Sequence, residues 1–313
     1  IIVPFDKLHP YFSSKSEVPA IGNVMASRWA YEALTVVQFK DNEYEKRFFK
    51  FDKKMSFANW KKDQWESNLD SKLTNFYRIA HKEHPLHTEI EKVKRDGQII
   101  INEIRKEIKN FNSSSLYNKE DIEKLLLTIK NNNMEKKDYL SLHNYLTSIR
   151  DYYMNQYNLA SNSKDEILIR ETDPDSTFIS KMRGLKKQKV ITSKEYRSYK
   201  NLMSYLKKYQ FQKFKNSYSN HSLEDFVTNS NSLTFITEDE TGLIQKSDPI
   251  YLDPINHKYF GAHFYSPSKY FLDYKFDTFN ANLIVIWLMT LLLTVTLYFD
   301  VLRKILEINS SKR

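Results

Sequence analysis

The sequence predicts a mainly α-helical membrane protein fragment that ends in one transmembrane helix. Three observations support this fold class. Only five of the 313 residues are glycine, far below the usual share of about 7%, which disfavours folds built on many glycine turns. Apolar residues recur every three or four positions over residues 88–111, as on one face of a helix. Residues 278–299 contain no charged side chain.

The chain opens at Ile1 with an apolar stretch, residues 1–4, that is too short for a signal peptide. We therefore expect the chain to be a fragment of a longer protein. Residues 24–39 are predicted to form the first helix. Arg28 and Glu32 lie four positions apart on it, so their side chains can pair.

Four further segments have helical periodicity: residues 67–80, 88–111, 118–129 and 137–159. We expect their apolar faces to form the core of an antiparallel helical bundle, or else a coiled coil for a partner protein. Gly97 is the small residue on the longest stripe. The members of these stripes are Leu69, Leu73, Phe76, Tyr77, Ile90, Val93, Gly97, Ile101, Ile104, Ile108, Phe111, Leu125, Ile129, Leu142, Leu146, Ile149 and Tyr153.

The next helix is predicted to begin at a capping box formed by Thr192 and Glu195 and to continue to about residue 214. We expect its apolar residues Tyr199, Leu202, Met203 and Leu206 to face inward. Residues 233–245 have the pattern of a small β-hairpin with an acidic, glycine-containing turn.

Residues 278–299 are the predicted transmembrane helix. A helix of 22 residues measures roughly 33 Å, enough to cross a hydrocarbon core of about 30 Å. Four Lys or Arg residues follow this segment, whereas residues 259–277 just before it hold only Lys269 and Lys275. The positive-inside rule therefore places the C-terminus in the cytoplasm and residues 1–277 outside. The expected anchors at the membrane are Trp287, Tyr298, Arg303 and Lys304.

Residues 181–215 are strongly basic. They hold twelve Lys or Arg and one acid, Glu195, for a local charge of +11, whereas the whole chain carries +9. Tyr and Phe residues are interleaved with these cations, so three interpretations are open: a solvated helix face, a surface for anionic lipid or a partner protein, and a nucleic-acid site. The predicted topology argues against nucleic acid. The patch consists of Lys186, Lys187, Lys189, Arg197, Lys200, Lys207 and Lys208.

The sequence offers no active site. Without cysteine there is no disulfide, thiolate nucleophile or cysteine-ligated metal, and no glycine-rich phosphate-binding loop is present. His81, His84 and His87 are spaced three apart, but Pro85 breaks the helix that would have to carry them. We therefore expect a solvated helix end there, and neither a metal nor a cofactor in this chain.

Two regions carry a family resemblance. Residues 2–8 and 19–39 resemble the outer-leaflet segment after the fifth membrane helix of ABC exporter permeases of the type-2, G (White)-like class, whose pattern is similar to "R-Y-A-x-E-A-L-x-x-N-E-F". The last helix looks like the sixth helix of that domain, and residues 248–251 and 263–267 look like an insert returning to the membrane in the long fused ATPase–permease proteins of Bacteroidetes-type bacteria. The motif positions are Pro4, Phe5, Asp6, Lys7, Arg28, Tyr31 and Glu32, with Ala33, Leu34 and Phe39 matching beyond them.

The resemblance implies a division into an outer-leaflet segment with an amphipathic helix (1–39), a large helical extracytoplasmic insert (40–277), the transmembrane helix (278–299) and a cytoplasmic tail (300–313). It implies an ATP-driven exporter of a hydrophobic or lipid-like substrate, working as a dimer in the bacterial inner membrane. ATP and Mg would bind an upstream domain. The alternative is a single-pass, membrane-anchored periplasmic adaptor whose helical bundle binds a partner protein.

Overall fold

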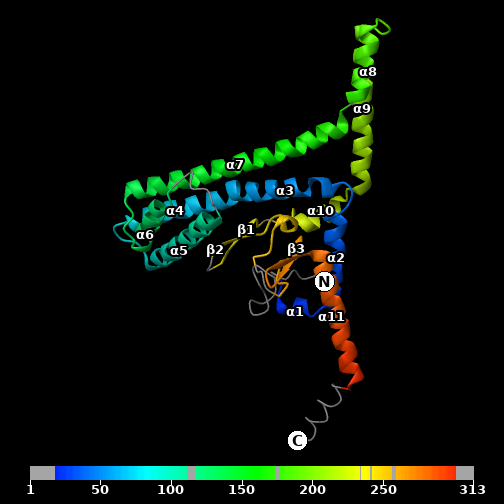
Figure 1. The fold of residues 1–313 in the computed structure, drawn as a ribbon. Coiled ribbons are helices and arrows are strands. Elements are labelled where there is room, and N and C mark those ends of the chain that lie inside the picture. The colour runs from blue at the N-terminus through cyan, green and yellow to red at the C-terminus, as the bar shows by residue number, and fades with distance from the viewer. Residues whose placement is uncertain are drawn as a thin grey trace. The chain divides into compact units, whose positions relative to one another are not determined.

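The computed structural model describes residues 18–110, 118–173, 176–232, 234–239, 242–255 and 259–300. The described chain is mainly helical, with two small antiparallel hairpins, as Figure 1 shows. It divides into two compact units, which we describe separately. Unit 1 takes in residues up to Asp41, residues 223–239 and the chain from Leu243 on; unit 2 takes in residues 42–222 and Gly242.

Unit 2 contains a helical bundle whose first member is one long helix with an irregular turn. Helix α3 (Glu45–Trp60) passes through a π-helical turn, η2 (Lys61–Trp65), into α4 (Glu66–Ala80). Helices α5 (His87–Asn110), α6 (Lys119–Lys130) and α7 (Lys136–Thr172) complete the bundle. Helix α7 packs on α3 and α4, α4 packs on α5, and α5 packs on α6.

The predicted apolar stripes supply the core of this bundle. Leu69, Leu73, Ile104, Leu142 and Leu146 are fully buried. The Asn118 side chain accepts a hydrogen bond from the Glu120 amide and caps α6, as its position ahead of the helix predicts.

Three expectations for unit 2 need correction or extension. Ile90, an expected core residue, is 37% exposed because it lies in the first turn of α5, at the edge of the bundle. Helix α7 continues to Thr172, beyond the predicted end at residue 159. Its extension was missed because residues 161–166 are all polar and interrupt the apolar stripe. Helix α3 was not predicted, because Lys and Phe alternate along it without a clear helical period.

Gly97 lies where α4, α5 and α6 meet. A Cβ atom placed there would approach Phe76 Cε2 to 3.0 Å and Ile129 Cγ2 to 3.1 Å, so the small residue permits close packing. We expect Gly97→Leu to destabilise unit 2 by about 1–3 kcal/mol through overpacking, although leucine is the better helix former. Thermal unfolding followed by circular dichroism measures this effect, and an unchanged melting temperature would contradict it.

Unit 2 also includes α8 (Ser176–Lys187) and α9 (Ser193–Tyr218), which pack on each other. The capping box is confirmed: Thr192 Oγ1 accepts from the Glu195 amide, and the Glu195 carboxylate accepts from the Thr192 amide. The expected inward face is wrong, because Tyr199, Leu202 and Leu206 are exposed and Met203 is only half-buried.

Unit 1 begins with a short helix, α1 (Ala20–Asn23), and α2 (Ala26–Lys40). Later segments are α10 (His221–Thr228), the predicted hairpin of β1 (Ile236–Asp239) and β2 (Gly242–Gln245), and the 3-10 turn η3 (Pro249–Tyr251). A second hairpin, β3 (Ser268–Phe271) with β4 (Tyr274–Asp277), was not predicted. Its register pairs Ser268 with Asp277 and Phe271 with Tyr274.

Helix α11 (Thr278–Tyr298) follows β4 directly. The Asp277 side chain accepts a hydrogen bond from the Phe279 amide and caps its first turn. By length and composition α11 can cross a membrane, as expected from its sequence. Only its first turns are buried, at Thr278, Ala281 and Asn282, and the rest presents apolar side chains outward.

Candidate functional site

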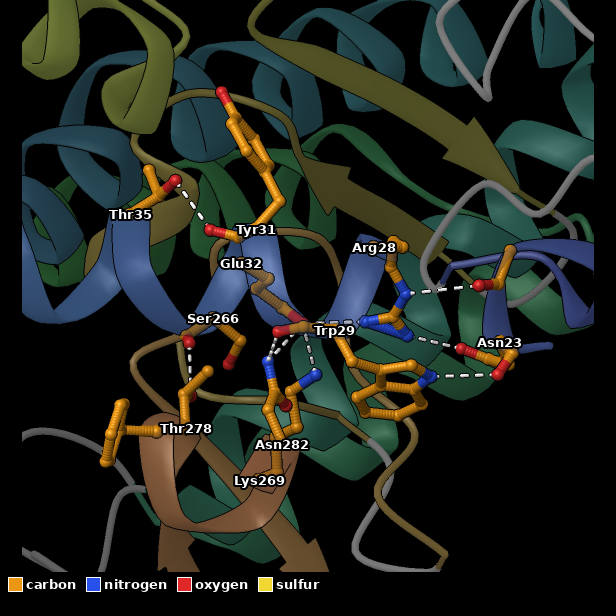
Figure 2. Close-up of polar contacts among 12 residues, drawn as sticks. Asn23, Arg28, Trp29, Tyr31, Glu32, Thr35, Ser266, Lys269, Thr278 and Asn282 are labelled. Atoms are coloured by element: carbon orange, nitrogen blue, oxygen red, sulfur yellow. Dashed lines mark hydrogen bonds and ion pairs between the residues drawn. The ribbon is translucent and has the colours of Figure 1, made fainter. Parts of the chain in front are cut away.

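The candidate site is a buried polar cluster where α2 packs against the start of α11 (Figure 2). Lys40, at the end of α2, pairs with Asp277, the cap of α11. One turn into α11, Asn282 Nδ2 donates to the backbone oxygen of Trp29 at 3.0 Å. Because the later α2 residue meets the earlier α11 residue, the two helices run antiparallel.

Glu32 is the centre of the cluster and is completely buried. Its Oε2 atom accepts from Arg28 Nη1 at 2.6 Å, from Lys269 Nζ at 2.6 Å and from Asn282 Nδ2 at 3.0 Å. These donors come from α2, β3 and α11, so one carboxylate oxygen joins three elements of unit 1. Lys269 is 237 residues from Glu32 in the sequence. Its side chain nevertheless packs against Glu32 and is only 1% exposed.

The Trp29 ring lies beside both cations. The Arg28 guanidinium lies 3.7 Å and the Lys269 amine 4.4 Å from the ring centroid, both within cation–π range. The indole Nε1 donates to the Asn23 backbone oxygen at 2.8 Å, and Arg28 Nη2 donates to the Asn23 side chain. These contacts fix α1 on α2.

The cluster holds two cations against one carboxylate. Burial raises the pKa of Glu32, but Lys269 and Arg28 outweigh it and hold this pKa below its ordinary value. Burial, opposed in part by Glu32, lowers the pKa of Lys269 to about 8. Because the Arg28 guanidinium does not lose its proton, Lys269 is the cation that deprotonates when the excess positive charge is relieved.

This imbalance predicts how the stability of unit 1 depends on pH. An unfolded lysine keeps its proton up to about pH 10.5, whereas folded Lys269 releases it near pH 8. Between these values the unfolded state binds more protons, so the Lys269 contribution makes the free energy of unfolding rise with pH. Melting temperatures of the wild type and Lys269→Met across this range test it: the rise should be absent from the variant, and parallel curves would contradict it.

Two buried acceptor atoms of the cluster have no hydrogen-bond donor in the described part of the chain. Glu32 Oε1 and Asn282 Oδ1 are both buried without a partner among the described residues. Each such acceptor costs roughly 1–3 kcal/mol. The arrangement therefore gives up stability while it fixes α2, β3 and α11 in one geometry.

Most of the resemblance segments within the described residues meet around this cluster. The exposed ring of Tyr31 stacks on Phe264, with ring centroids 6.2 Å apart. Phe39 meets the Tyr251 ring edge-on, at 6.2 Å. His263 Nε2 lies 2.8 Å from the Pro249 backbone oxygen, and burial lowers the pKa of this histidine.

Other predicted site residues lie away from the cluster. Trp287 and Tyr298 are exposed on α11. Lys186 and Lys187 end α8, Lys189 follows it with positive φ, and Arg197, Lys200, Lys207 and Lys208 lie on α9. Pro4, Phe5, Asp6, Lys7, Arg303 and Lys304 lie outside the described residues.

A second buried ionic cluster surrounds the π-helical turn of unit 2. Lys61 Nζ donates to Glu107 at 2.5 Å and lies 4.0 Å from the centroid of the Trp65 ring. Tyr153 donates to the other oxygen of Glu107, and Trp65 Nε1 donates to Glu103 at 2.7 Å. Burial, with Glu107 beside it, raises the pKa of Tyr153. The network ties the irregular turn to α5 and α7.

Sequence analysis identified Arg28 and Glu32 as a pair but missed Lys269, Asn282 and the cluster in unit 2. The described residues contain no group of three or more His, Asp or Glu that could hold a metal ion. Comparisons with protein-family models, curated proteins and solved structures found no match to this chain. The functional proposal below therefore depends on the sequence motif and on the geometry of unit 1.

Proposed function

We propose that the chain is the membrane and extracytoplasmic part of an ATP-driven exporter of the type-2, G-like class. Helices α1 and α2 form its outer-leaflet segment, α11 is its last transmembrane helix, and unit 2 belongs to the extracytoplasmic insert. The transported substrate is hydrophobic or lipid-like. ATP is bound by a separate upstream domain, and two permease domains pair.

One observation carries the proposal. The resemblance segments are scattered along the sequence, at residues 19–39, 248–251, 263–267 and in α11. They nevertheless pack into one unit, in which Arg28 and Glu32 of the motif lie at the junction with α11. In an exporter, this junction would hold the outer segment against the last transmembrane helix and so close the outer gate.

The proposal is tested on the native assembly that contains this chain, purified from its membrane with an antibody against unit 2. We expect an ATPase domain or subunit to be part of it and ATP hydrolysis to be stimulated by lipid-like compounds. An assembly without ATP hydrolysis would overturn the proposal and favour the membrane-anchored adaptor.

Topology gives a second, independent test. The chain has no cysteine, so Ser198→Cys on the exposed surface of α9 is its only thiol. We expect a membrane-impermeant maleimide to label it once the reagent reaches the outer face of the inner membrane. Labelling that requires permeabilisation of the inner membrane would place unit 2 in the cytoplasm and overturn the topology.

A further inference from the structure

Helix α9 carries an exposed apolar stripe. Tyr199, Leu202, Tyr205, Leu206 and Tyr209 recur at helical spacing, and their side chains are between 41% and 67% exposed. No residue of α9 is buried. Isolated exposed apolar residues are common, but five on one helix face form a contiguous surface that favours an interaction site.

The opposite side of α9 is the side that unit 2 uses for packing. Phe211 and Phe214 contact the Tyr44 ring, with ring centroids 5.9 Å and 6.3 Å apart. Phe211 follows Leu202 by nine residues, about two and a half turns, so the two lie on opposite sides of the helix. The stripe therefore points away from the packed aromatic side.

The helix that carries the stripe is also rich in cations. Residues 181–215 carry +11 with Glu195 as the sole acid, and Glu195 is occupied by the capping box. Lys194, Arg197, Lys208 and Lys213 are all exposed on α9. Helical spacing places Lys194 at the edge of the stripe and Lys213 within it, whereas Arg197 and Lys208 lie more than 100° round the helix from Leu202. An apolar stripe of Tyr and Leu on a helix whose other faces are rich in Lys and Arg is the pattern of a helix that lies in a membrane interface.

We propose that α9 is an interfacial helix that binds the surface of an anionic phospholipid bilayer. The stripe enters the boundary between headgroups and acyl chains, and the cations of the helix bind the headgroup phosphates. The chain also contains α11, a helix able to cross a membrane. A chain that is anchored in a membrane has a bilayer surface available as an anionic partner. This inference does not depend on the exporter proposal.

Other occupants fit less well. A second copy of the same face would bring +11 against +11, which repels. Nucleic acid would engage the cations and could stack on Tyr, but it leaves Leu202 and Leu206 without an apolar partner. An acidic protein could cover both, but only the bilayer supplies charge and an apolar layer over the whole length of a helix without a matched sequence.

The test uses the full chain in neutral phosphatidylcholine nanodiscs, so that α11 is already embedded. Tyr205→Cys, the only thiol, carries an environment-sensitive fluorophore. We expect its emission to rise and shift to the blue when vesicles of mixed phosphatidylcholine and phosphatidylglycerol are added, and not with pure phosphatidylcholine vesicles. The same label at Ser141→Cys, exposed on α7, should not respond.

Two further variants of the labelled chain separate charge from apolar contact. Replacing Lys194, Arg197, Lys208 and Lys213 with Gln should weaken binding by roughly fivefold per cation, and high salt should mimic this loss. Leu202→Ser with Tyr209→Ser should abolish the blue shift. Its matched control is Leu140→Ser with Leu159→Ser, on similarly exposed positions of α7, which should leave the shift intact.

Three outcomes would overturn the proposal. They are no response to anionic vesicles, an equal response at Ser141→Cys, and a response to single-stranded oligonucleotide or polyglutamate that exceeds the response to the vesicles. The last of these would identify nucleic acid or an acidic protein as the partner instead. Circular dichroism of every variant verifies that α9 is still helical.

Discussion

Replacing Glu32 with alanine should destabilise unit 1 by about 3–5 kcal/mol, the largest effect we expect from any single change there. The substitution removes the acceptor shared by Arg28, Lys269 and Asn282. Two buried cations then lie close together beside the Trp29 ring without a counter-charge. Because the three donors come from different elements, we expect α2, β3 and α11 to separate together.

Hydrogen exchange of the full chain in detergent micelles measures this loss, because the protection of the α2 amides reports the opening of unit 1. The matched control is Lys275→Ala. It removes the exposed partner of Asp253 in the same unit, and an exposed ion pair contributes at most about 1 kcal/mol. If both variants exchange alike, Glu32 does not hold the junction.

A combined variant separates the effect of the cluster on the stability of unit 1 from its effect on the proposed transport. Arg28→Met, Glu32→Leu and Lys269→Met together replace the ionic side chains with apolar ones of similar size. Such replacements are often neutral or stabilising, because buried charges are costly to desolvate. We expect protection of α2 to recover. If the chain belongs to the exporter proposed above, ATP-driven export by the native assembly should be lost. Full export by this variant would mean that the charges have no role in transport.

Much of the helical framework could be predicted from local sequence. The stripe of α5, the cap at Asn118 and the capping box at Thr192 each depend on residues within a few positions of one another. The apolar run of α11 is equally local. Periodicity and capping therefore predicted α2, the later part of the bundle and the last helix to within a few residues, apart from the end of α7.

The buried polar clusters could not be predicted in the same way. Lys269 lies 237 positions from Glu32, and Lys61 lies 46 positions from Glu107. Local patterns assign such residues to solvent, because most Lys and Glu are exposed. The π-helical turn adds to this, since it shifts the apolar pattern between α3 and α4. Only the tertiary packing shows which charged side chains are buried in pairs.

Helix α9 shows a different limit. Its spacing correctly groups Tyr199, Leu202 and Leu206 on one face, but that face is exposed. Periodicity identifies which residues share a helix face, and it does not say what covers that face. A second aromatic side, with Phe211 and Phe214, packs on unit 2 instead. Helix α9 therefore has two apolar sides, one exposed and one packed, and the sequence shows this only as a large number of aromatic residues in one helix.

Ile104→Asp should unfold the bundle of unit 2. Ile104 is fully buried in the middle of α5, so aspartate would place an unpaired carboxylate in the core. We expect a loss of about 4–5 kcal/mol or more, at the extreme of single substitutions, because both the apolar contact and the solvation of the charge are lost. A loss of this size approaches the whole stability of a small domain.

Ile90→Asp is the matched control, because it makes the same change two heptads earlier on the same predicted stripe. Ile90 is 37% exposed, so the aspartate keeps its water and we expect a change within about 0.5 kcal/mol. If Ile104→Asp leaves no folded protein to measure, Ile104→Val should still cost about 0.5–1.5 kcal/mol. Amide protection of α5 and the melting temperature report both effects. Equal effects at Ile90 and Ile104 would mean that the periodic pattern, and not the observed burial, determines the stability of α5.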